Sequence, residues 1–156
     1  MKNIPKSVSE HIANAKYYLD AADKHPQPTQ NAALILLLLV GWENIVIADH
    51  ELGAWANQAD IDPQIRKSHA AKLKNVPDVT RIIVGSSGMP PKEIVFSTGH
   101  DFEELRMACQ YGSNTESKDV SQIFKTGWHL DELRNGLIEK IKWEETMLEI
   151  YQNLPK

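Results

Sequence analysis

The amino-acid sequence predicts an all-α fold, an antiparallel bundle of four to six helices. Apolar residues recur at spacings of three and four along most of the chain, which is the period of an α-helix. Segments that contain proline or glycine separate these periodic stretches. The stretch at residues 32–42 is apolar almost throughout, as in a central helix that neighbours cover on several sides.

Size and composition indicate one ordinary globular domain, which we expect to span residues 1–156. The chain has 156 residues, of which 42% are hydrophobic and 24% are charged. The net charge of −4 argues against a generic nucleic-acid scaffold, which would carry a basic excess, but it leaves room for a local basic patch. Cys109 is the only cysteine, so the chain can form neither an internal disulfide nor a cysteine-based zinc site.

The first helix is predicted over residues 7–24. Ser7 is a suitable N-cap, and Glu10 follows three residues later, as in a capping box. A segment with two prolines, residues 25–28, ends this helix. Its apolar stripe consists of Ile12, Ala15, Leu19 and Ala22.

The second helix is predicted over residues 29–59, with Thr29 as its N-cap. Its apolar run covers residues 32–42, which is shorter than the roughly 20 residues that a membrane span needs. The N-terminus also lacks the apolar core of a secretion signal. We therefore expect a buried helix, no membrane association and a cytoplasmic location.

A short third helix is predicted over residues 64–74, with Asp62 as its cap and Pro63 at its first position. Residues 79–84 fit either a helix or a short strand, and residues 93–96 are β-prone. Between them, a loop at about residues 85–92 is rich in glycine, serine and proline, and we expect it to be flexible.

Two further helical regions complete the prediction. One begins near Thr98, where Asp101 stands three residues on, and runs to about Tyr111. The other extends from residue 117 to the C-terminus as one long helix or as two, with a break at Thr126-Gly127.

Glu43 is the first candidate for a functional residue, because it directly follows the apolar run of the second helix. A carboxylate that is partly buried needs a partner or a raised pKa. The candidate partners from other helices are His69, Lys72, Arg106 and Arg134. Two interpretations remain open at this point: a structural polar link that fixes helix register, and a functional site.

Metal and phosphate sites are not predicted. Glu43, His50 and His69 are suitable ligand types for zinc or iron, but no closely spaced ligand pair is present. The dyad His100-Asp101 fits the start of a helix. The glycine-rich loop at residues 85–88 lacks the lysine and hydroxyl residue of a phosphate-binding P-loop. We therefore expect no metal and no cofactor.

Three segments resemble the AbiV-type abortive-infection proteins within the broader HEPN group. The apolar helix at residues 32–44 resembles the family helix that runs into a Glu-Glu-x-x-Lys turn. His69-Ala70-Ala71-Lys72-Leu73 matches a His-x-x-Lys-Leu pattern, and Arg106 with Tyr111 is similar to the third segment. The resemblance covers about residues 10–112. It implies a HEPN-like helical bundle, a dimer around a shared cleft, and metal-independent cleavage of RNA.

The chain departs from the family pattern at several positions. Asn44 stands at the second acidic position and Ile47 at the lysine position. The ribonuclease motif of the HEPN group is an arginine followed four to six residues later by histidine, but Arg106 is followed by Tyr111 and Arg134 by Glu139 to Ile141. Such cleavage needs a base for the 2′-hydroxyl and a cation for the phosphate, so the incomplete motif weakens the ribonuclease interpretation.

The leading hypothesis is a HEPN/AbiV-like protein of a prokaryotic defence or stress system that binds RNA or is a degenerate ribonuclease. In it, Arg106 and Arg134 contact phosphate, and Glu43, His69 and Tyr111 orient them. The alternative is a non-catalytic bundle that binds a partner protein or a small ligand. It is supported by the acidic charge and three tryptophans, Trp55, Trp128 and Trp143. A third hypothesis is a metal-dependent hydrolase that uses Glu43, His50, His69 and His100.

Overall fold

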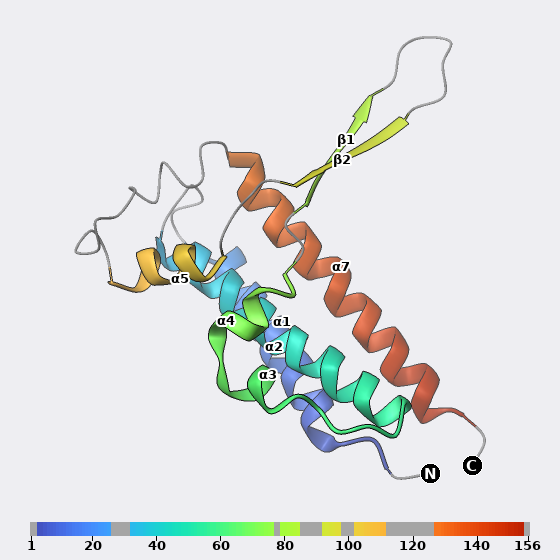
Figure 1. Ribbon diagram of the computed structural model, residues 1–156. Coiled ribbons are helices and arrows are strands. Elements are labelled where there is room, and N and C mark those ends of the chain that lie inside the picture. Colours follow the sequence, from blue (N-terminus) through green and yellow to red (C-terminus); the bar gives the residue numbers. More distant parts are fainter. Residues whose placement is uncertain are drawn as a thin grey trace.

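The protein is an all-α helical bundle, as predicted, and a two-stranded hairpin extends from it (Figure 1). The computed structural model describes residues 3–25, 32–76, 79–84, 92–97, 102–111 and 127–154. Three long helices dominate this part of the chain: α1 (Lys6–Asp23), α2 (Ala32–Ala56) and α7 (Gly127–Gln152). Two short helices and one of intermediate length cover one side of α2, and no HEPN-specific feature of the bundle follows from this arrangement alone.

Contacts between side chains fix the directions of the long helices. Ser7 of α1 contacts Glu51 of α2, and His11 contacts Asn44, so the numbering rises on one helix as it falls on the other. α1 is therefore antiparallel to α2. The Lys16–Glu145 ion pair, with a second pair from α1 to α7 nearer the other end, shows that α1 is also antiparallel to α7.

α2 and α7, by contrast, run parallel to each other, which the sequence did not indicate. Trp42 of α2 donates from Nε1 to the carbonyl oxygen of Leu133 at 2.9 Å. Further along both helices, the ring centroids of Trp55 and Tyr151 lie 5.4 Å apart. A parallel pair needs a long crossover connection, and residues 57–126 provide it. Figure 1 shows both helices ending near the chain's termini.

α2 is the centre of the core. Its buried positions lie all round the helix, as the apolar sequence predicts, because α1, α4, α5 and α7 each pack against it. At Gly41, α2 and α7 pack so closely that a Cβ would lie 2.8 Å from Leu137 Cδ2 of α7. By length and composition α2 could cross a membrane, but 61% of its apolar window is buried inside the protein, the pattern of a core helix.

The predicted third helix is divided into two pieces, α3 (Pro63–Lys67) and α4 (His69–Leu73). Asp62 caps α3 as predicted, because its side chain accepts from the backbone N–H of Gln64 at 2.9 Å. Ser68 interrupts the helix with an extended backbone, and its hydroxyl oxygen then accepts from the N–H of Ala71. The serine therefore ends one helical segment and caps the next.

The region left open by the sequence contains strands. β1 (Val79–Val84) pairs antiparallel with β2 (Lys92–Ser97), with Val79 opposite Ser97 and Val84 opposite Lys92. The strand interpretation of residues 79–84 and the β-prone run at 93–96 are confirmed. The predicted flexible loop at about residues 85–92 lies outside the described residues except for Lys92, which begins β2.

Helix boundaries follow the predictions within a few residues, with one wrong cap. α1 begins after Pro5, and Ser7 lies inside the helix, where its hydroxyl donates to Glu51 Oε2 at 2.5 Å instead of closing a capping box. α5 (Phe102–Tyr111) ends where predicted. α7 begins at Gly127, the predicted break. The predicted caps Thr29 and Thr98, with Asp101, lie outside the described residues.

Candidate functional site

A row of ion pairs fixes the α3–α4 segment along α2. Arg66 Nη2 lies 2.7 Å from Glu51 Oε1, and His69 Nδ1 lies 2.7 Å from Glu43 Oε2. Lys72 Nζ lies 3.2 Å from the same Glu43 oxygen. The three basic residues come from both helices of the segment, and each contacts a buried carboxylate of α2. The two acids lie eight residues apart on α2, which places them about two turns apart.

The Glu43–His69 pair is the most chemically suggestive contact in this row. His69 Nδ1 lies 2.8 and 2.7 Å from the two carboxylate oxygens of Glu43. The Glu43 side chain is only 6% exposed, whereas that of His69 is 52% exposed. The carboxylate therefore favours a proton on Nδ1 and directs the other ring nitrogen, Nε2, away from Glu43.

Such a pair can perform acid–base chemistry. A buried carboxylate that orients an accessible imidazole is the arrangement by which histidine serves as a general base. Lys72, whose side chain is 9% exposed, supplies a second positive partner that compensates the buried charge of Glu43. The same contacts also hold α4 on α2, so the structural interpretation and the functional one apply to the same residues.

Arg106 is held by its own helix. Its guanidinium donates from Nε and Nη2 to the two carboxylate oxygens of Glu103, each at 2.9 Å, and from Nη1 to Gln110 Oε1. α5 packs against both α2 and α4, so Arg106 lies on a helix next to the Glu43–His69 pair. Arg106 is buried, and the contacts described here for its guanidinium lie within its own helix.

Arg134 lies elsewhere in the bundle. Its Nε and Nη2 donate to the two carboxylate oxygens of Asp23 at 2.6 and 2.9 Å, and this pair links α7 to the end of α1. The Asp23 partner raises the pKa of the guanidinium further. Arg134 thus does not join Glu43, contrary to the expectation from sequence. The side chain of Tyr111 lies outside the described part of the structure.

Two buried carboxylates escaped the sequence interpretation as site residues. Glu51 is 4% exposed and accepts from both Ser7 and Arg66. Glu144 of α7 is 1% exposed and lies with Lys140 against Asp49 of α2. In the sequence, only the spacing of charged residues could have indicated these two carboxylates. Glu51 follows Glu43 by eight residues, and Glu144 follows Lys140 by four.

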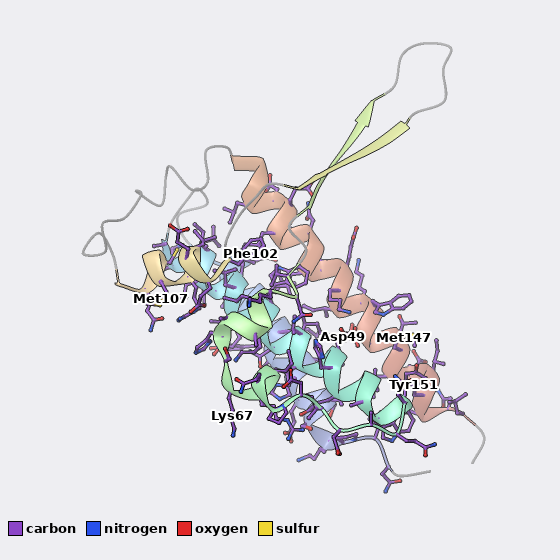
Figure 2. All side chains as sticks on the ribbon, in the orientation of Figure 1. Asp49, Lys67, Phe102, Met107, Met147 and Tyr151 are labelled. Atoms are coloured by element: carbon purple, nitrogen blue, oxygen red, sulfur yellow. The ribbon has the colours of Figure 1, made fainter. Side chains whose placement is uncertain are left out.

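The Glu144 cluster carries the largest titration shift toward neutrality in the described part of the chain. The pKa of Glu144 is raised from 4.5 to about 7, mainly by burial and in smaller part by Asp49. Lys140 opposes this rise from 2.7 Å, in an ion pair that lacks the alignment of a hydrogen bond. Figure 2 shows Asp49 between α2 and α7, where the cluster joins the two helices.

Cysteine and metal chemistry receive no support from the described residues. Burial raises the pKa of the Cys109 thiol to about 11, so the thiol stays protonated near neutrality, in keeping with a small packed residue. Among the residues that the structure describes, no group of three or more histidine, cysteine or acidic side chains could hold a metal ion. His100, from the hydrolase hypothesis, lies outside them.

Comparisons with protein-family models, with curated proteins and with solved structures find no match to this chain.

Proposed function

We propose that this chain is a HEPN/AbiV-like protein of a prokaryotic defence or stress system, and that it cleaves bound RNA without a metal. The observation that carries the proposal is the accessible imidazole of His69, held by the buried Glu43 carboxylate at 2.7 Å. The incomplete arginine–histidine motif weakens the resemblance. A histidine from a different helix supplies the missing base in this proposal.

In the proposed reaction, His69 Nε2 accepts the proton of a ribose 2′-hydroxyl. The 2′-oxygen then attacks the adjacent phosphorus, and the bond from phosphorus to the 5′-oxygen breaks. The leaving oxygen takes a proton from water, and the hydroxide that remains takes the proton back from His69. The products are a 2′,3′-cyclic phosphate and a 5′-hydroxyl, so the reaction consumes no oxidant, metal or cofactor.

The phosphate needs a cation, and the α3–α4 segment carries the best-placed ones. Residues 63–74 contain Arg66, Lys67, Lys72 and Lys74 and no acidic residue. Lys67 and Lys74 are exposed, and they precede and follow His69 in the sequence. Residues 63–74 are thus a locally basic stretch in a chain of net negative charge. Lys67 and Lys74 thereby replace Arg106 and Arg134 as the proposed phosphate contacts, because Glu103 and Asp23 occupy the two arginines.

The test compares two single-histidine variants. Purified protein is incubated with transfer RNA or total RNA, with and without EDTA, and the ends of the products are analysed. We expect cleavage that EDTA does not inhibit, and products that carry cyclic phosphate. His69→Gln should lower the rate by at least about 100-fold, whereas His50→Gln, which lies outside the pair, should not. Intact RNA with the wild-type protein, or equal loss in both variants, would contradict the proposal.

A second candidate function is a non-catalytic interaction bundle that binds a partner protein. One specific observation favours it: α7 exposes two large apolar side chains, Trp143 at 58% and Ile150 at 48%. They lie seven residues apart and hence on one face of the helix. Trp55, by contrast, packs partly buried against the core, and Trp128's side chain lies outside the described residues.

The resemblance also leads us to propose a homodimer. One measurement tests both the dimer and the exposed face of α7 as an interaction surface. Native mass spectrometry of the wild-type protein and of Trp143→Ser gives the oligomeric state of each. Loss of a dimer in Trp143→Ser assigns the α7 face to self-association. A monomer in both samples would remove the dimer from the proposal.

A further inference from the structure

A cavity lies at the end of the bundle where α2 and α7 both terminate. Its volume is about 520 Å³, which is within the usual range for small-molecule sites. Trp55 and Tyr151 form an edge-to-face pair in its wall, with ring planes at 61°. Figure 2 shows Tyr151 at the C-terminal end of α7. Trp55 follows Glu43 by twelve residues on α2, about 18 Å along the axis, so this cavity is separate from the Glu43–His69 pair.

The electrostatics of this end of the molecule favour a cation. Because α2 and α7 are parallel, the negative ends of both helix dipoles point toward the cavity. Both helices are described to their last residues, and neither has a basic residue in its last turn. Asp60, an exposed acid of the α2–α3 connection, adds a formal negative charge to the wall.

The neighbouring hollow extends the same negative surface. It has a volume of about 340 Å³ and shares Ala54, Ala59 and Asp60 with the first cavity. Asp49 and Asp62 also line it. Those two carboxylates are already engaged, Asp49 by Lys140 and Asp62 by the backbone of α3. Asp60 therefore stands between the two hollows as the carboxylate best able to accept a new partner.

We propose that this cavity binds an aliphatic amine, with an ammonium group held between Asp60 and the aromatic wall formed by Trp55 and Tyr151. Aromatic faces next to a carboxylate attract ammonium groups by combining cation–π and ionic terms. Leu154 and Ala54 supply the apolar wall for the carbon chain. A second ammonium of a diamine reaches the neighbouring hollow past Asp60. The proposal does not depend on ribonuclease activity.

The probe is putrescine, and its control is butanediol, which has the same carbon chain without charge. Isothermal titration of the full chain should show saturable binding of putrescine, no binding of butanediol, and no competition from magnesium at equal ionic strength. Asp60→Asn should weaken binding about two- to five-fold, as loss of an exposed ion pair does. Tyr151→Leu should have an effect of similar size, since it removes a π face but keeps apolar bulk.

Glu139→Gln is the matched control, because Glu139 is exposed on α7 and its replacement changes the net charge equally. It should leave putrescine affinity unchanged. The proposal is overturned by the absence of saturation up to about 10 mM, which corresponds to less than about 3 kcal/mol of binding free energy. It is also overturned if butanediol binds as well as putrescine, or if Glu139→Gln weakens binding as much as Asp60→Asn does.

Discussion

Replacing Glu144 by glutamine is expected to stabilise the protein at neutral and basic pH. Glu144 is 1% exposed, and burial raises the pKa of its carboxyl group from 4.5 to about 7. The Lys140 ammonium, 2.7 Å away, opposes this rise, and Asp49 adds to it. Glutamine has nearly the same shape but carries no charge, so the variant removes the cost of ionising the buried group.

The sign of the pH dependence follows from proton binding. Since the pKa is higher in the folded protein, the folded state holds more protons than the unfolded state between about pH 4.5 and pH 7. The free energy of unfolding therefore falls as pH rises through this window and levels off above it. The shift from 4.5 to about 7 corresponds to about 3 kcal/mol.

Urea denaturation at several pH values between about 5 and 8 measures this effect. Wild type and Glu144→Gln should have similar free energies of unfolding at the acidic end, and the variant should be more stable at the basic end. Glu139→Gln is the control, since Glu139 is an exposed acid on the same helix. A Glu144→Gln variant that is less stable than wild type near pH 8, or that keeps the wild-type slope, would refute the reasoning.

Three further substitutions test the packing of the bundle. Gln58 has φ of 54°, a left-handed conformation that favours glycine. Gln58→Gly should therefore raise the free energy of unfolding by about 1 kcal/mol, and a variant with a lower melting temperature than wild type would contradict this. Arg66→Met leaves the buried Glu51 carboxylate without its cation, so the free energy of unfolding at neutral pH should fall by about 2 kcal/mol. The expected loss is no larger because Arg66 is half-exposed; an unchanged urea unfolding curve would disprove the pairing. Trp42→Phe removes the indole donor to the carbonyl oxygen of Leu133, so the free energy of unfolding in the same assay should fall by about 1–2 kcal/mol. A variant as stable as wild type would show that this buried hydrogen bond does not stabilise the fold.

Helices were predictable where local period alone determines them. α1 and α7 follow apolar repeats that persist over many turns, and such repeats indicate a helix without knowledge of its neighbours. α2 was predicted from an unbroken apolar run that is typical of a central helix. The cap at Ser7 was wrong for the opposite reason. Its hydroxyl donates to Glu51, which lies 44 residues away in the chain, and no local pattern reveals that partner. The parallel direction of α2 and α7 was hidden for the same reason.

The candidate site was predictable in part. Glu43 was expected to be buried and paired, and two of its four candidate partners, His69 and Lys72, contact it. Arg106 instead pairs with Glu103, three residues earlier on its own helix, because a local acid needs no tertiary contact to form the pair. Arg134 pairs with Asp23 at the far end of α1. Sequence thus gave the residue types, but only the packing of helices selects among the partners.

Two buried carboxylates of α2, Glu51 and Glu43, hold the α3–α4 segment at separate places, and this separation makes the proposed site testable. α2 is apolar on nearly all sides, so burial alone does not fix which residues of a neighbour lie opposite it, whereas paired charges do. Arg66–Glu51 holds one end of the segment, and His69–Glu43 holds the other. Glu43→Gln therefore keeps the Arg66 contact that positions the segment, while it removes the charge that orients His69 and that also pairs with the buried Lys72. Loss of RNA cleavage in that variant, with its unfolding transition retained, would assign Glu43 to chemistry and not only to docking.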